Sequence, residues 1–235
     1  MKTARAFAFA AMIACVCTLS GCSTLDQIIG ADDWKDWTPD TTSIQVHADG
    51  SLTETIFDTL DQSWYQGNEL QDMIARSMNE YNDSHTAGAV NVTSYSDTDG
   101  VVKVVIDYRT DDDYAQYNNA EFVSGSMLDA QMKGFRLEGQ FLEADGSKLK
   151  GDVLDASVPL SHKEYSVVIS DGTHVVQVPG EIRYVGEGAQ LVNSHVAKVS
   201  EDAGGENPAV PLTIIYEKDQ EYTSILDTGS ESQSQ

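Results

Sequence analysis

Four Asp-Gly dipeptides separate stretches in which apolar and polar residues alternate, and this pattern constrains the fold more than any other feature of the chain. They are Asp49-Gly50, Asp99-Gly100, Asp145-Gly146 and Asp171-Gly172. Asp-Gly suits the tight turn of a β-hairpin, and a period of two places every second side chain on one face of a sheet. The pattern therefore predicts a strand-rich chain built from hairpins.

Two hairpins are predicted in the first half of the chain. Their strands span 44–48 with 52–56, and 89–95 with 101–108. Between the strands of the first hairpin, Asp49 and Gly50 are expected to form a type I′ turn with both residues at positive φ. The second turn spans Asp97, Thr98, Asp99 and Gly100 and should bring two apolar, β-branched strands together.

One amphipathic helix is predicted between these hairpins, from Glu69 to Asn82. Its apolar and small residues recur at three- and four-residue spacing and form one stripe: Leu70, Met73, Ile74, Ser77, Met78 and Tyr81. Asn68 can cap the helix, with Gln71 reaching back as in a capping box. We expect the stripe to pack on the sheet as part of the core.

Asp111, Asp112 and Asp113 form the densest acidic cluster. Aspartates in the first turn of a helix accept hydrogen bonds from free backbone N–H groups and interact favourably with the helix dipole. One interpretation is therefore a helix of one or two turns within 110–119. The alternative is a calcium site formed by the three carboxylates. No other cofactor is expected.

A further short helix is predicted from Met127 to Lys133, between Ser126 as its N-cap and Gly134. The period of two then prevails, and it predicts strands within 135–141, 165–169, 175–178, 182–185, 190–199 and 212–216. The expected fold class is α+β, with antiparallel hairpins packed with one main helix in the first half and a β-rich second half.

The change of period after Gly134 divides the chain into an α+β lobe, 43–134, and a β-rich lobe, 135–226. Because no linker rich in Pro, Ser or Gly separates them, a single α+β domain stays open as the alternative. Residues 227–235 are polar and are expected to form a disordered tail.

The N-terminus has the features of an export signal. Lys2 and Arg5 precede an apolar run at 6–19 that is too short to span a bilayer as a mature helix. Residues 19–22 read Leu, Ser, Gly, Cys and resemble the lipobox of bacterial lipoproteins. The resemblance implies a signal peptide at 1–21, diacylation of Cys22, and a lipid-anchored location on the cell membrane, facing outside the cytoplasm.

Residues 22–42 would then form the lipid anchor and tether. Five large apolar residues make this segment unusual for a tether: Leu25, Ile28, Ile29, Trp34 and Trp37. They are expected to dock on the folded domain, to place the tryptophan rings at the membrane interface, or to contact a partner.

Charge and cysteine content exclude several classes of function. The formal net charge is −24, and it becomes −26 when Lys2 and Arg5 leave with the signal peptide. Nucleic acid is not expected as a partner, because its phosphates require clustered Lys and Arg. Cys15 and Cys17 also leave with the signal peptide. With Cys22 acylated, the mature chain has no thiol for disulfides or nucleophilic catalysis.

No set of catalytic residues is evident. Five histidines are scattered and interpreted as surface or turn residues: His47, His85, His162, His174 and His195. The favoured hypothesis is a non-enzymatic module that binds a protein, peptide or glycan. The alternative is a cell-envelope hydrolase that uses Asp111 and Asp113, with Trp64 and Tyr65 as a sugar-stacking surface.

Two stretches carry a second resemblance: DGSLTETIFDTLDQSWYQGNELQDMIARSMNEYN at 49–82 and DGVVKVVIDYRTDDDYAQYNNAEFVSGSM at 99–127. They are similar to a group of uncharacterised lipoproteins from anaerobic Gram-positive gut bacteria. The resemblance covers about 44–134, implies a one-membrane host and implies no particular activity.

Overall fold

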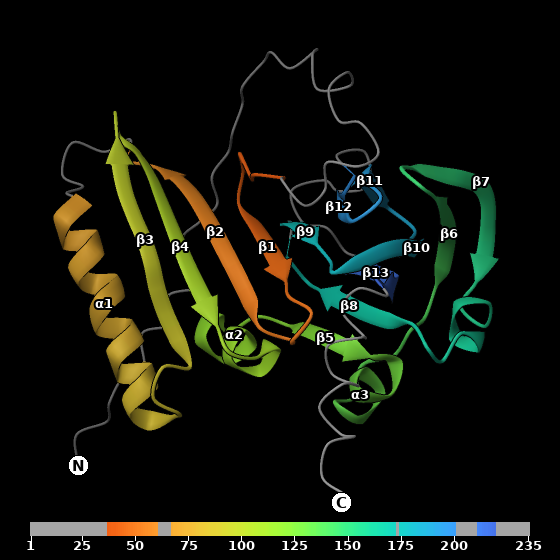
Figure 1. The fold of residues 1–235 in the computed structure, drawn as a ribbon, viewed down its shortest axis with the longest axis horizontal. Coiled ribbons are helices and arrows are strands. Elements are labelled where there is room, and N and C mark those ends of the chain that lie inside the picture. Colours follow the sequence, from red (N-terminus) through yellow and green to blue (C-terminus); the bar gives the residue numbers. More distant parts are fainter. Residues whose placement is uncertain (1–36, 61–66, 173, 201–210, 220–235) are drawn as a thin grey trace, which may run out of the picture.

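The computed structural model describes residues 37–60, 67–172, 174–200 and 211–219 (Figure 1). Within these ranges the chain forms three α-helices and 13 strands, arranged in two sheets. The fold is therefore mixed and strand-rich, as the alternation predicts. The lipobox with Cys22, Trp64 and Tyr65, and the expected tail at 227–235 lie outside the described residues.

The first sheet has seven strands in the order β11-β12-β9-β1-β2-β4-β3. Their bounds are Ser43–Val46 (β1), Leu52–Thr59 (β2), Val90–Thr98 (β3), Val101–Tyr108 (β4), Val175–Gln177 (β9), Ala189–Asn193 (β11) and Val196–Val199 (β12). β1 and β9 run parallel, and the other neighbouring strands are antiparallel. Helix α1, Gly67–Ser84, lies along β3 (Figure 1).

The second sheet has six antiparallel strands in the order β5-β8-β13-β10-β6-β7. Their bounds are Phe122–Ser126 (β5), Gln140–Asp145 (β6), Lys148–Asp155 (β7), Ser166–Ser170 (β8), Gly180–Gly186 (β10) and Leu212–Lys218 (β13). Helices α2, Asp111–Asn118, and α3, Met127–Met132, flank β5, and a 3-10 turn spans Pro159–Ser161.

The buried apolar side chains form two clusters, one on each side of the second sheet. The larger cluster joins residues of the first sheet, such as Ile44 and Tyr108, to residues of the second sheet, such as Ile214. The smaller cluster holds Ile215, together with Met127 from α3. Because neighbouring residues of a strand point to opposite faces, β13 is buried on both sides.

Strands from both sides of position 134 pair with each other. β1 pairs with β9 in the first sheet, and β5 pairs with β8 in the second. The larger core cluster likewise combines residues from before and after this position. This pairing favours the single α+β domain that the sequence left open.

The first hairpin forms, but its turn is not the predicted type I′. Gly50 has a φ of 88°, and Asp49 is not among the residues at positive φ. The Gly50 N–H donates to the His47 carbonyl at 3.0 Å, and the His47 N–H donates to the Ser51 carbonyl at 2.9 Å. This geometry is a three-residue loop with Gly50 at the left-handed position. Asp49 instead accepts hydrogen bonds from Ser51.

The second hairpin forms as predicted, but its turn is shorter, because β3 continues through Asp97 and Thr98. β3 and β4 are joined by Asp99 and Gly100, with φ values of 54° and 81°. Two consecutive positive φ values match the type I′ turn, whose twist suits antiparallel strands.

Three predictions for the second half are wrong. Residues 135–139 are not a strand, because β6 begins at Gln140 after Gly139 turns the chain at a φ of 91°. The range 190–199 is two strands, β11 and β12, joined at Ser194 and His195. Asp171-Gly172 makes no hairpin, because β8 and β9 belong to different sheets. In the first half, the strand β5 was not predicted.

All three helices form close to their predicted positions. α1 begins at Gly67, so Asn68 lies inside the helix and is not its cap. Its apolar stripe is only half-buried, because the helix lies along an edge strand. At α3, Ser126 and Asp129 form a reciprocal capping box.

Candidate functional site

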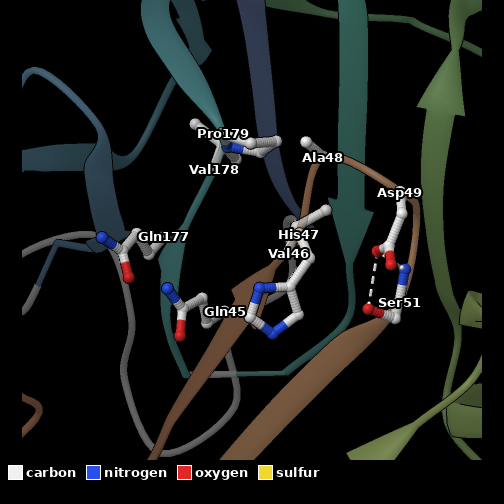
Figure 2. Close-up of a pocket in the computed structure, with 9 residues that line it drawn as sticks. All are labelled: Gln45, Val46, His47, Ala48, Asp49, Ser51, Gln177, Val178 and Pro179. Atoms are coloured by element: carbon white, nitrogen blue, oxygen red, sulfur yellow. Dashed lines mark hydrogen bonds between the residues drawn. The ribbon is translucent and has the colours of Figure 1, made fainter. Parts of the chain in front are cut away.

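An open groove of about 480 Å³ lies where β1 and β9 meet the loop between β1 and β2 (Figure 2). Its polar and ring-bearing lining comes from β1 and the residue after it (Gln45, His47), from the loop (Asp49, Ser51), and from β9 and its end (Gln177, Pro179). The groove therefore collects side chains from two segments that are distant in sequence.

Strand alternation explains why these side chains share one face. In the parallel register Gln45 is opposite Gln177. The next residues, Val46 and Val178, are 4% and 0% exposed and point into the larger core cluster. The glutamines therefore point the other way, and Figure 2 shows both amides on the same side of the strands as the His47 ring.

A hydrogen-bond chain from His47 through Thr53 of β2 to Asp107 of β4 constrains the tautomer of the His47 ring. The Thr53 hydroxyl donates to Oδ1 of Asp107 at 2.8 Å and lies 2.8 Å from Nε2 of His47. A hydroxyl has one proton to donate and an ionised carboxylate only accepts, so Nε2 must carry the hydrogen. In the neutral ring, Nδ1 is then the hydrogen-bond acceptor, and His47 is one of the residues that line the groove.

Asp49 supplies the negative charge of the groove. Its Oδ1 accepts from the Ser51 hydroxyl at 2.7 Å and from the Ser51 N–H at 3.0 Å. These two hydrogen bonds hold the pKa of Asp49 below its ordinary value, because they stabilise the ionised form. Among the described residues that line the groove, none is Lys or Arg.

The aspartate cluster is used within the fold. Asp111 is buried, accepts from the Ser124 N–H at 3.0 Å and binds the Lys133 ammonium at 2.7 Å. Asp112 binds the same ammonium at 2.8 Å. These aspartates begin α2, which confirms the helix interpretation.

Asp113 completes the N-terminus of α2. Its backbone N–H donates to Oγ1 of Thr110, the N-cap residue, and its carboxylate accepts from the Thr110 hydroxyl at 2.7 Å. It also accepts from the Tyr81 hydroxyl of α1 at 3.2 Å. Among the described residues, no group of three or more His, Cys, Asp or Glu is arranged to hold a metal ion. The contacts of this cluster therefore account for its role in capping α2.

Ser194, His195 and Asp219 have the composition of a catalytic triad but not its accessibility. The Ser194 hydroxyl lies 2.9 Å from Nδ1 of His195, and Nε2 of His195 lies 3.6 Å from Asp219. Ser194 and His195 are 8% and 5% exposed and sit in the turn between β11 and β12. They do not line the groove, so we interpret them as part of that turn.

The groove residues were not predicted as a site from the sequence: Asp49 was interpreted only as a turn residue, and His47 as a surface or turn residue. The missing signal is the parallel pairing of β1 with β9, which no local pattern encodes. Comparisons with known protein families, curated proteins and solved structures find no match to this chain. None of the helices in the described part of the chain is long and apolar enough to cross a membrane.

Proposed function

We propose that this protein is a lipid-anchored lipoprotein on the outer face of the cell membrane, whose folded domain binds a peptide or glycan without transforming it. The observation that carries the binding role is the groove, which gathers two amides, an imidazole and a carboxylate from separate segments. Ligand sites are usually concavities of about 300–1,000 Å³ in which a few polar groups stand among apolar walls, and the groove shares this size and combination.

The hydrogen bonds in the groove support binding over catalysis. The Ser51 hydroxyl donates to Asp49, and Nε2 of His47 donates to Thr53. The imidazole nitrogen that could accept a proton, Nδ1, is therefore not paired with the hydroxyl of Ser51. A nucleophile activated by a general base requires that pairing. The hydrolase alternative uses the carboxylates of Asp111 and Asp113. Both instead accept hydrogen bonds within the fold: Asp113 from the Thr110 hydroxyl at the start of α2, and Asp111 from the Ser124 N–H in β5.

The anchor rests on the lipobox resemblance at Cys22, which lies outside the described residues. Two acyl chains on this cysteine would hold the domain at the bilayer, because each buried methylene contributes roughly 0.8 kcal/mol. Trp37, at the beginning of the described residues, is half-buried. The tether thus ends close to the folded domain.

The anchor can be tested by acylation. Metabolic labelling with a fatty-acid probe should mark the wild type and Cys17→Ala, a matched change of another N-terminal cysteine. Cys22→Ala should carry no label and should leave the membrane fraction or keep its signal peptide. A labelled Cys22→Ala chain would contradict the proposed anchor.

A further inference from the structure

The charge of the groove restricts the ligands that it can hold. Asp49 is the one charged side chain among the described lining residues, and its carboxylate is kept ionised by Ser51. The chain as a whole has a formal net charge of −24. Phosphates and carboxylates would be repelled at this site, whereas neutral and basic ligands would not.

The shape and chemistry of the lining favour peptide groups over sugar rings. None of the described lining residues is Phe, Tyr or Trp, the side chains with the large apolar ring faces on which sugars stack. The half-buried Gln45 instead presents an amide, which has the same donor and acceptor groups as a peptide unit. Gln177 lies beside it on β9, also lines the groove and is 3% exposed.

His47 supplies the next contact along the groove. It lies two residues beyond Gln45, so the two side chains project from the same face of the β1 segment. Because Thr53 occupies Nε2, the ring offers Nδ1 as an acceptor for an N–H group. Gln45 and His47 are therefore spaced to hydrogen-bond two groups of an extended backbone.

We propose that the groove takes an extended peptide segment that is neutral or basic, with Gln45 and His47 bonding its backbone and Asp49 pairing with a Lys or Arg side chain. This inference rests on the proposed binding function and specifies its ligand class. Thr53 is a positioning residue, because it acts on the ligand only through the His47 ring.

The test compares three probes on the mature lipidated chain in nanodiscs. They are an acetylated, amidated alanine peptide with one central Lys, the same peptide with Glu, and chitotetraose. We expect the Lys peptide to bind at least about threefold more tightly than the Glu peptide, as for an exposed ion pair. Asp49→Asn should remove this preference.

The matched control is Asp99→Asn, which makes the same change at the distant Asp-Gly turn of β3 and β4. It should keep the wild-type preference, since Asn also tolerates a positive φ. Thr53→Val should weaken the binding of both peptides, because the His47 ring is no longer fixed in one tautomer.

Equal binding of the two peptides, or a preference that survives in Asp49→Asn, would overturn the inference. Binding of chitotetraose without either peptide would overturn the peptide assignment while leaving the proposed binding function in place. If none of the three probes binds, the peptide inference fails, and the anchor can still be judged separately from the acylation of Cys22.

Discussion

Glu54 is a carboxylic acid inside the larger core region, with only 5% of its surface exposed. The Tyr108 hydroxyl donates to its Oε2 at 2.6 Å, and the Asn118 amide donates to that hydroxyl at 3.1 Å. Burial raises the pKa of Glu54 to about 7, although the hydrogen bonds from Tyr108 and Asn118 act in the opposite direction. The side chain is therefore neutral in the folded protein at mildly acidic pH.

This pKa predicts how stability changes with pH. In the unfolded chain Glu54 ionises near pH 4.5, whereas in the folded protein it holds its proton until about pH 7. Between these values the unfolded state binds fewer protons, so stability falls as pH rises. The free energy of unfolding of the wild type, relative to Glu54→Gln, should fall by roughly 3 kcal/mol between pH 4.5 and 7.

Urea titrations across this pH range measure the difference. Glu80→Gln, a change of an exposed glutamate on α1, serves as the control and should keep the wild-type pH dependence. If the free energies of unfolding of Glu54→Gln and of the wild type change in parallel from pH 4.5 to 7, the prediction of a raised pKa for Glu54 is wrong.

At the scale of elements, the free edges of strands β3 and β5 are covered by helix side chains. The Asn82 amide of α1 donates to the Val90 carbonyl at 2.8 Å and accepts from the Val90 N–H at 3.0 Å. Sδ of Met78 accepts from the Val92 N–H at 3.4 Å. In β5, the Ser124 N–H likewise donates to the carboxylate of Asp111 in α2. These contacts replace a neighbouring strand and block edge-to-edge association.

Asn82→Ala should therefore remove the side chain that pairs with the edge of β3 at Val90. Leaving the Val90 N–H and carbonyl without partners should cost about 1–3 kcal/mol of stability. The amide proton of Val90 should exchange faster than in the wild type, as measured by NMR hydrogen exchange. Asp83→Ala, its exposed neighbour on the helix, should leave that exchange unchanged. Undiminished protection of Val90 in Asn82→Ala would contradict the role assigned to α1.

At the scale of the whole molecule, each of the two sheets contains strands from both halves of the chain. β1 is held between β2, its hairpin partner, and β9, which comes from the second half. β5, the last strand before the change of period, pairs only with β8 in the second sheet. Neither half retains a complete sheet when the other is removed.

Separate fragments test this interdependence. Residues 37–134 and 135–219, expressed apart, should each lack a cooperative thermal transition, because each would expose the strand edges and core residues that the other covers. The intact chain should unfold in one transition by circular dichroism and by calorimetry. A cooperative transition in fragment 37–134 alone would instead support two independent lobes.

The sequence by itself predicted the elements that depend on neighbours along the chain. The β3–β4 hairpin follows from alternation around Asp99 and Gly100, and α2 follows from aspartates beside Thr110. Short-range hydrogen bonds decide these features, so a local pattern is sufficient to indicate them. The lipobox ending at Cys22 is local in the same way, and it stays a prediction.

The tertiary structure decided what depends on distant segments. The alternation of Phe135 and Leu137 resembled a strand, yet these side chains pack on the smaller core cluster from an irregular segment. Gln45 and Gln177 line one groove because β1 and β9 pair in parallel, and no property of either segment alone specifies that partner. Strand pairing is chosen by burial of the whole core. The sequence could therefore indicate strands, while the candidate site arose only from their arrangement.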